Sequence, residues 1–453
     1  MHHTRHRVHH PASLWRRALV HTPVMYHVAL DAVFAWLDAA SLLAAGAVCR
    51  RWMERAGRTE AWRSRVAGVG WARGLHPRDA YLRSLRVRRR WRRCADIAVS
   101  HVGSDYRINY GMLCSDGDWL AFQSTGVRLD ATSAGIGTRS VVRVYDVGRA
   151  RAVAAIPVDE SPLALRIAVS SSLGRCAVLS KPRNAPGACE VWAPAADGPA
   201  WRPTCRLELD SADELHWQRD MLLACRRNFH PGPMLGWGGV KAEWYDVGSG
   251  TTLAVASREY PAGRPHMVHI GDRDLLVIGS AVYALDARAP PAAEASPLTT
   301  LRSGFGAGAV AVGATGLGDG RLIAATFGDA SCGALGVELW DVRAAGRDAA
   351  PVAGLRSACW YDTLCGTARG TVLGTASAPC GEHANHHDHL CQNCTVSLEE
   401  WDVARGASAP LLLGRIPDTD GKTSFVWTDE RRIVVSCNGG ELFVLDADTV
   451  GGT

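Results

Sequence analysis

Lysine is almost absent from this sequence. Lys181, Lys241 and Lys422 are the only lysines among 453 residues, whereas arginines number 47. A genome that prefers arginine codons is the simplest explanation of this bias. The charge is also unevenly placed: residues 1–94 hold 19 arginines and 5 acidic residues, a formal charge of +14, whereas the rest of the chain carries −9. We therefore expect the two parts to face different partners or solvent environments.

Long uninterrupted apolar segments are also lacking. The Arg- and His-rich first residues contain no apolar core long enough for a secretory signal before Asp31, although their few acids leave a transit peptide as an alternative. The apolar run over residues 30–48 is interrupted by Asp31 and Asp38, and a carboxylate within a membrane span costs roughly 3 kcal/mol. We expect no membrane association, a cytoplasmic or nuclear location, and 14 cysteines that stay reduced.

Signatures of common catalytic sites are missing as well. No Gly-x-Ser-x-Gly nucleophile elbow occurs in the sequence. Gly421, Lys422 and Thr423 resemble the end of a phosphate-binding loop, but Ile416 replaces the glycine that such a loop requires five residues earlier. We therefore expect a protein that is not an enzyme.

Residues 28–66 show the apolar spacing of short amphipathic helices. In the first helix the apolar residues recur at steps of three and four, and they are Val28, Leu30, Val33, Phe34 and Leu37. A second stripe begins at Leu42 after Asp38, and Ser41 is the expected N-terminal cap of that helix. Such short helices bury little apolar surface by themselves, so we expect them to dock on another surface.

This stretch resembles the F-box. The family pattern joins a hydrophobic helix, an Asp-x-x-x-Leu step, a Val-Cys-Arg-x-Trp sequence and a trailing tryptophan. The matching residues are Phe34, Leu37, Asp38, Leu42, Val48, Cys49, Arg50, Trp52 and Trp62. The Leu-Pro pair that usually opens the motif is missing, because Pro23 lies too far upstream and follows Thr22.

The resemblance implies docking on the Skp-type adaptor of a cullin–RING ubiquitin ligase. The residues that it assigns to this interface are Leu30, Val33, Phe34, Leu37, Leu42, Val48, Cys49, Trp52 and Trp62. The basic surface would suit an acidic adaptor. The alternative is a helical cap that only packs on the domain that follows.

Six arginines occupy residues 86–93, together with Val87 and Trp91. Such a run suits nucleic acid or nuclear localisation, but it more often forms a solvated helix face or a linker. Because the following domain is acidic and would repel phosphate, we do not expect nucleic acid to be a partner.

From about residue 95 the pattern changes to short alternating strands that repeat. Seven segments end in a hydrophobic-Asp pair or its equivalent, and that last position is Asp146, Ala193, Asp246, Asp286, Asp341, Asp402 and Asp446. The steps between them are 47, 53, 40, 55, 61 and 44 residues, which is the range of propeller blades. The domain resembles WD-repeat propellers, but it has no Gly-His dipeptide.

Each repeat also contains a tight polar turn followed by an apolar strand, which predicts a hairpin. A further strand after the hydrophobic-Asp segment gives four strands in each unit. The seventh unit lacks this last strand because the chain ends at Thr453. We predict that residues 94–102 supply it, because closing the ring removes two open sheet edges.

A cluster of cysteine and histidine interrupts the sixth repeat. Residues 380–394 contain three Cys and four His, with a Cys-x-x-Cys pair at their end. Such a pair supplies two of the four ligands of a structural zinc site. The candidate ligands are Cys380, His383, His386, Cys391 and Cys394. The alternative is a polar surface insertion with incidental thiols, and the sequence favours neither.

The sequence thus predicts a mainly β protein, a seven-bladed β-propeller preceded by a small all-α F-box helical module. The expected parts are a basic, His-rich disordered tail (1–22), the F-box-like module (23–67), an Arg-rich helical linker (68–93) and the propeller (94–453), with a Cys/His-rich insertion at 376–397. The predicted function is a substrate adaptor that binds the Skp subunit, through it a cullin, and an unknown protein target on a propeller face. The alternative is a propeller scaffold outside any ligase.

Overall fold

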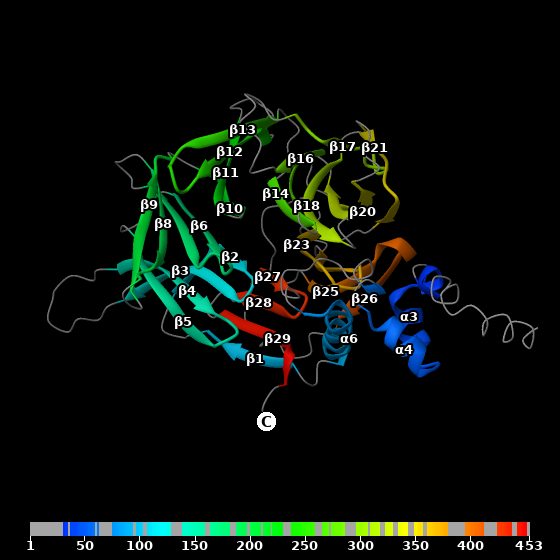
Figure 1. Ribbon diagram of the computed structural model, residues 1–453. Helices are drawn as coiled ribbons and strands as arrows, with labels where there is room; N and C mark the ends of the chain where they lie inside the picture. The colour runs from blue at the N-terminus through cyan, green and yellow to red at the C-terminus, as the bar shows by residue number, and fades with distance from the viewer. Residues whose placement is uncertain are drawn as a thin grey trace, which may run out of the picture.

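In the computed structural model the chain forms a ring of β-sheets, with a small group of helices against it (Figure 1). The structure describes residues 30–34, 37–58, 61–62, 75–93, 97–102, 107–127, 138–158, 164–181, 187–196, 200–209, 212–218, 220–229, 237–258, 265–270, 273–285, 296–306, 309–317, 322–328, 334–342, 348–356, 360–378, 395–411, 424–436 and 442–450. Within these ranges, no helix combines the length and apolar character that crossing a membrane requires.

The helices come first in the chain. Residues 30–34 are helical, and they are followed by α3 (Ala39–Gly46), α4 (Arg50–Ala56) and the longer α6 (Pro77–Arg93). Asp38, not Ser41, caps α3: its side chain accepts a hydrogen bond of 2.7 Å from the backbone N–H of Ser41. The prediction of Ser41 was wrong because a carboxylate one residue before the helix reaches the free N–H groups of the first turn.

Seven mainly antiparallel sheets follow, and each corresponds to one of the seven repeats. Blade 1 contains β2 (Arg107–Asp116), β3 (Trp119–Val127), β4 (Thr138–Asp146) and β5 (Arg151–Val158). Blade 2 contains β6 (Ala164–Ser170), β7 (Arg175–Lys181), β8 (Ala188–Pro194) and β9 (Trp201–Leu207). Blade 3 contains β10 (Glu214–Gln218), β11 (Met221–Phe229), β12 (Trp237–Asp246) and β13 (Thr252–Arg258).

The remaining blades continue the ring. Blade 4 contains β14 (Pro265–Ile270), β15 (Arg273–Ile278), β16 (Ala281–Leu285) and β17 (Thr299–Leu301). Blade 5 contains β18 (Val310–Leu317), β19 (Leu322–Gly328), β20 (Ala334–Asp341) and β22 (Ala353–Arg356). Blade 6 contains β23 (Trp360–Gly366), β24 (Val372–Ala378), β25 (Thr395–Asp402), the 3₁₀ turn η2 (Val403–Arg405) and β26 (Ala407–Leu411). Blade 7 contains β27 (Ser424–Asp429), β28 (Arg432–Ser436) and β29 (Leu442–Val450).

The fourth blade departs from the prediction of four strands in each unit. A short fifth strand, β21 (Asp348–Ala349), joins its outer edge by parallel pairing with β17. This segment belongs in sequence to the connection between β20 and β22 of blade 5. The connection therefore crosses to the neighbouring blade, where it pairs with an edge that would otherwise be open.

The seventh blade takes its outer strand from the beginning of the domain. β1 (Ile97–His101) pairs antiparallel with β29. Val102, which directly follows β1, donates its backbone N–H to the carbonyl of Leu442 at the start of β29, at 2.8 Å. At the seam with blade 1, the guanidinium of Arg432 binds both Asp446 of its own blade and Asp118 of blade 1. The ring is thus closed by strand pairing and by a bridging arginine.

α6 lies across the ends of strands in blades 6 and 7 (Figure 1). Val87 and Trp91 of α6 are buried in one cluster with Leu373 and Leu398 of blade 6 and with Ile433, Val435 and Leu445 of blade 7. The indole N–H of Trp91 also donates to the backbone carbonyl of Glu430 at 2.9 Å. Residues 77–93, expected to form a linker, therefore attach the helices to the ring.

The arginines of α6 that face the ring are paired. Arg88 and Arg92 contact the carboxylate of Glu400 at 2.6 and 3.4 Å, and Arg83 binds Asp448 through its Nε at 2.9 Å. Glu400 is only 2% exposed, and burial raises the pKa of its carboxyl. The charges of Arg369 and Arg88 outweigh burial and leave that pKa below its ordinary value. Glu400 is therefore a buried, ionised anchor for α6.

We expect Gly374→Ala in β24 to weaken blade 6. A β-carbon at this position would overlap the ring of the fully buried Trp401 on the neighbouring strand. The indole must shift within a packed core, so the expected loss of unfolding free energy is about 3 kcal/mol. Thermal and denaturant unfolding measure the loss. Gly148→Ala, where the nearest atom would be 3.4 Å away in an exposed turn, should change stability by less than about 0.5 kcal/mol. Equal stability of the two variants would contradict the prediction.

We expect Trp91→Ala to loosen α6 from the ring. Removal of a fully buried tryptophan typically costs about 3–5 kcal/mol, and here it also removes the hydrogen bond to Glu430. Hydrogen exchange of the α6 amides should become faster than that of β11, which lies in blade 3. The matched control is Arg89→Ala, an exposed position on the same helix, which should leave exchange unchanged. Exchange that rises equally in α6 and β11 would show global destabilisation instead.

Candidate functional site

The helical module, defined here as residues 30–62, packs around a cluster of buried apolar side chains. Four of the residues that the F-box resemblance assigned to an interface are buried in it: Leu30, Phe34, Leu42 and Trp62, with exposed fractions of at most 6%. The ring of Phe34 meets that of Trp52 edge-on at 5.5 Å. The indole N–H of Trp62 donates to the carbonyl of Ala56 at 2.5 Å. These four side chains hold the helices together and are not available to a partner.

The core of the module continues into the rest of the protein. Ala80 and Tyr81 of α6 belong to the same buried cluster, and so does Ala368 from the turn between β23 and β24 of blade 6. The ring of Tyr81 lies 5.5 Å from that of Trp62. Because part of the core comes from the propeller, we expect the module to depend on the whole chain for its stability.

The remaining apolar residues of the module are exposed on its surface. Val33 is 50% exposed, Val48 is 64% exposed and Cys49 is also exposed. Met53, which the sequence interpretation did not include, is 49% exposed and lies four residues after Cys49, on the same side of α4. Leu37 and Trp52 are half-buried. We call Val33, Val48, Cys49 and Met53 the exposed apolar set.

Ion pairs and a cap hold the segments that carry this set. Arg55 of α4 contacts Asp31 at 2.5 Å, which ties the first helical segment to α4. The backbone N–H of Ser41 lowers the pKa of Asp38 below its ordinary value, so the cap of α3 is ionised at neutral pH. Arg50, on the surface of α4, pairs with Glu54 at 3.1 Å. The exposed apolar set is therefore presented by helices whose relative positions are fixed.

The helices leave one face of the ring uncovered by α6. In blades 1 to 6 the turn between the first two strands lies on the same face as the turn between the last two, because the strands alternate in direction. α6 contacts Ala368 and Glu430, and each of these residues lies in the turn between the first two strands of its blade. The connections between second and third strands emerge on the opposite face.

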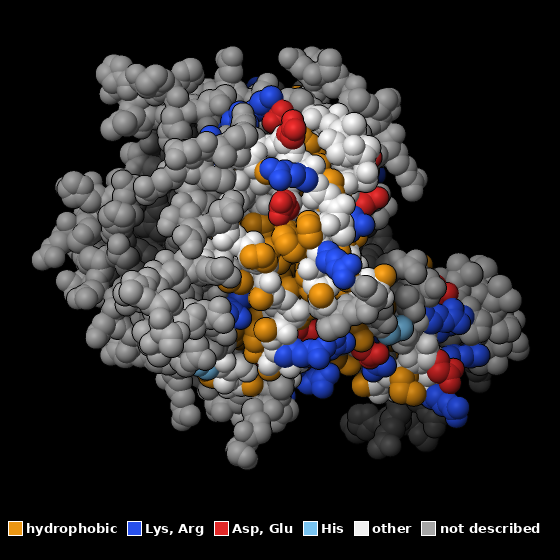
Figure 2. All heavy atoms as spheres, turned by 90° about the vertical axis from the view of Figure 1, so that its left-hand side faces the viewer, with side chains coloured by type: hydrophobic (Ala, Val, Ile, Leu, Met, Phe, Trp, Pro, Cys, Tyr) orange, Lys and Arg blue, Asp and Glu red, His pale blue; other side chains and the backbone are white. Residues whose placement is uncertain are grey.

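The outer side of blades 1 and 2 carries apolar side chains between scattered Lys, Arg, Asp and Glu (Figure 2). Trp119 and Trp201 are half-buried where these two blades meet, with their rings 5.6 Å apart and tilted by 50°. Trp192 packs against the same cluster, whose core includes Ile156 and Ile167. These indoles complete the packing between neighbouring blades.

The predicted zinc ligands Cys380, His383, His386, Cys391 and Cys394 lie outside the described residues. The strands on either side of them, β24 and β25, end and begin on the face opposite to α6. Within the described ranges, no group of three or more His, Cys, Asp or Glu is placed to hold a metal ion. The zinc site stays a prediction.

The arginine run of residues 86–93 is divided between two environments. Arg88, Arg90 and Arg92 contact blades 6 and 7, where Arg90 donates to the backbone carbonyl of Ala447 at 3.1 Å. Arg86, Arg89 and Arg93 are exposed. Half of the run therefore binds the protein's own carboxylates and carbonyls.

Comparisons with known proteins agree with this architecture. The F-box-like family model matches residues 29–67. None of the curated proteins compared matches the sequence. A chain in the "Crystal Structure of Mitotic Checkpoint Complex" has 12% identity, covers 77% of this chain and 90% of its own length, and gives a TM-score of 0.50.

Two WD-repeat domains also match. The WD40 domain of Toxoplasma gondii coronin has 12% identity, with 78% of this chain and 86% of that chain covered and a TM-score of 0.44. The RRP9 WD40 repeats have 11% identity, with 78% and 98% covered and a TM-score of 0.43. At such identities the likeness concerns the fold alone. Residues 29–67 thus match the F-box-like family, and the seven sheets that follow them in the chain form a seven-bladed β-propeller.

Proposed function

We propose that this protein is the substrate adaptor of a Skp–cullin–F-box ubiquitin ligase. In this role the helical module binds the Skp-type subunit, through it a cullin, and the propeller recruits a protein target. The protein itself would catalyse no reaction and would work in the cytoplasm or nucleus. The observation that carries the proposal is the exposed apolar set on a module that matches the F-box-like family.

The exposed apolar set suits a protein interface. Val33, Val48 and Met53 each expose about half or more of their surface to solvent, although the same module buries four other large apolar side chains. Exposed apolar side chains grouped on one small module are typical of a binding surface. Arginines at the start of α4, such as Arg50, would favour an acidic partner.

The attachment of α6 suits the recruitment of a target. α6 fixes the module against blades 6 and 7 on one face of the ring. A target held on the opposite face would lie at a set distance and orientation from the adaptor subunit. We therefore assign the target to the face where the connections between second and third strands emerge, since binding residues are concentrated on loops.

A propeller scaffold outside any ligase is the second candidate. The burial of Ala368 of blade 6 in the core of the module favours it, because a cap that only packs on the ring would share its core in this way. The two candidates differ in one respect: a cap has no use for an exposed apolar set, whereas an adaptor requires it.

The full-length protein should bind a purified Skp-type adaptor, and Val48→Asp should weaken that binding at least about tenfold. A carboxylate buried in an apolar interface without a partner is strongly unfavourable. Because Val48 is 64% exposed, the substitution should leave the unfolding midpoint unchanged. Calorimetric titration and thermal unfolding measure the two quantities.

The matched control is Val352→Asp, at a valine of the propeller that is 65% exposed. It introduces the same charge at nearly the same exposure on blade 5, outside the F-box-like segment, so binding should equal that of the wild type. If the wild-type protein does not bind the adaptor, the adaptor role is wrong and the scaffold is the remaining function. Binding that survives Val48→Asp would show that the interface lies elsewhere.

A further inference from the structure

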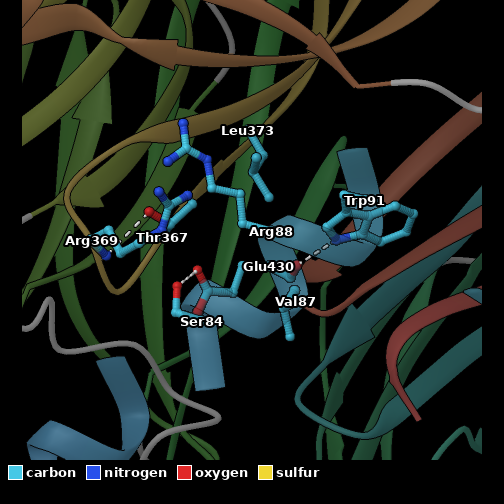
Figure 3. Close-up of a pocket in the computed structure, with 8 residues that line it drawn as sticks. All are labelled: Ser84, Val87, Arg88, Trp91, Thr367, Arg369, Leu373 and Glu430. Carbon is cyan, nitrogen blue, oxygen red and sulfur yellow. Dashed lines mark hydrogen bonds between the residues drawn. The ribbon is translucent and has the colours of Figure 1, made fainter. Parts of the chain in front are cut away.

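A narrow crevice separates α6 from blades 6 and 7 (Figure 3). Its lining residues come from three parts of the chain: Ser84, Val87, Arg88 and Trp91 from α6, Thr367, Arg369 and Leu373 from blade 6, and Glu430 from blade 7. Its volume is about 10 Å³, which is space for about one water molecule. The crevice therefore lies at the joint that attaches the helical module to the ring.

Glu430 connects all three parts. One of its carboxyl oxygens, Oε2, accepts hydrogen bonds from the hydroxyl of Ser84 at 2.8 Å and from the backbone N–H of Ala368 at 3.2 Å. Its backbone carbonyl accepts from the indole of Trp91. Only 2% of the residue is exposed. Movement of α6 away from the ring would break both contacts with α6 and would bring water to the carboxyl group.

The other carboxyl oxygen of Glu430 is buried and receives no hydrogen bond from any described residue. Among the described residues, Oε1 has no hydrogen-bond partner, and neither has Nε of Arg369 in the same crevice. A space of this size holds no hydration shell. An ionised carboxylate with one unsatisfied oxygen is costly in such a place, whereas a protonated carboxyl group is tolerated.

The surrounding charges do not cancel this cost. From blade 6, Arg369 faces Glu430, but its guanidinium and that of Arg88 are both bound to Glu400. From its own hairpin, Asp429 opposes ionisation, although Asp429 is paired with Arg431. Cys365, on β23, is a neutral neighbour, because burial first and then the charges of Asp429 and Glu430 raise the pKa of its thiol. No basic side chain among the described residues is committed to Glu430 alone.

The balance favours the protonated form more than in water. Burial raises the pKa of Glu430 to about 7, although the hydrogen bond from Ser84 and the charge of Arg369 lower it. The ordinary value is 4.5. Between these two values the docked state of α6 binds more protons than an undocked state in which Glu430 is hydrated. Linkage then requires that docking weakens as the pH rises from about 4.5 through about 7.

We propose that Glu430 is a proton-dependent latch that holds α6, and with it the helical module, against the propeller. With the proton bound, the carboxyl group sits in the crevice without charge and keeps its contacts with Ser84 and Ala368. With the proton lost, the buried charge favours opening of the joint and entry of water. This proposal does not depend on adaptor binding, because the same joint would respond to pH in an adaptor and in a scaffold.

Hydrogen exchange of the α6 amides in the full-length protein tests the latch. After correction for the intrinsic pH dependence of exchange, the opening equilibrium of α6 should rise about tenfold from pH 6 to pH 8, as values of about 7 and 4.5 for Glu430 require. In Glu430→Gln this dependence should disappear, and α6 should be better protected at pH 8 than in the wild type. Glutamine stays neutral and keeps an oxygen that accepts from Ser84 and Ala368.

Glu338→Gln is the matched control. Glu338 is also buried, at 3% exposure, and burial raises the pKa of its carboxyl, but it lies on β20 of blade 5. This variant should keep the wild-type response of α6 to pH. Amides of β11 in blade 3 report global unfolding, and their protection should not follow that of α6.

Ser84→Ala provides an independent test, since it leaves Glu430 in place. It removes a hydrogen bond that lowers the pKa of Glu430, so the midpoint of the α6 response should move to higher pH. A purely structural role of Ser84 would loosen α6 equally at every pH and leave the midpoint unchanged. Wild-type protection of α6 that stays constant from pH 6 to pH 8 would overturn the latch, as would full pH dependence in Glu430→Gln.

Discussion

The burial of Glu400 under α6 is the contact on which the arrangement of this protein depends. A carboxylate that is 2% exposed must be compensated by fixed positive charges, because its desolvation is costly. Arg369 of blade 6 provides one of them, and Arg88 and Arg92 of α6 provide the others. Without α6, the propeller would contain a buried carboxylate with too little compensating charge. The helix is held where its arginines contact that carboxylate. In this way an ion pair, together with the burial of Trp91, sets the position of the module.

This attachment decides what each surface of the molecule can do. The first turns of blades 6 and 7 face α6 across a shared crevice, and the connections between second and third strands lie on the opposite face of the ring. The exposed apolar set lies on helices whose core includes Tyr81 of α6 and Ala368 of blade 6. A partner bound to Val48 and a partner bound to the far face would thus be joined by packed side chains. A flexible linker would not keep the two partners at a fixed distance and orientation.

The ring could be predicted from the sequence because its signals are repeated. Seven copies of one strand pattern at blade spacing indicate seven sheets, and the missing strand after Asp446 points to residues 94–102 as its replacement. A single irregularity such as β21, which crosses to the neighbouring blade, leaves no repeated signal. Its pairing depends on the path of one connection in space, and spacing along the chain does not reveal it.

The candidate site was less predictable, for a reason that lies in the helical pattern itself. An apolar stripe shows that Leu30, Phe34 and Leu42 leave water, but it does not show whether they pack on the same chain or on a partner. In the structure they pack on the same chain, and the surface is left to Val33, Val48 and Met53. The arginine run was ambiguous likewise, since only the folded ring brings the carboxylate of Glu400 and the backbone carbonyl of Asp448 beneath it.

The two buried carboxyl groups of the joint respond to pH in opposite directions. The pKa of Glu400 lies below its ordinary value of 4.5. The contribution of Glu400 to docking is therefore complete above pH 4.5, and it is lost as the pH falls through the lowered pKa. The pKa of Glu430 lies above its ordinary value, so its contribution is complete below the ordinary value and is lost as the pH rises through about 7. Docking of α6 is then tightest near pH 4.5, the ordinary value that the two carboxyl groups share. Glu400 receives three guanidinium groups and the hydroxyl of Thr371, whereas Glu430, in the neighbouring blade, receives the hydroxyl of Ser84 and the backbone N–H of Ala368. The charged partners of Glu400 therefore account for the opposite direction of its pKa shift.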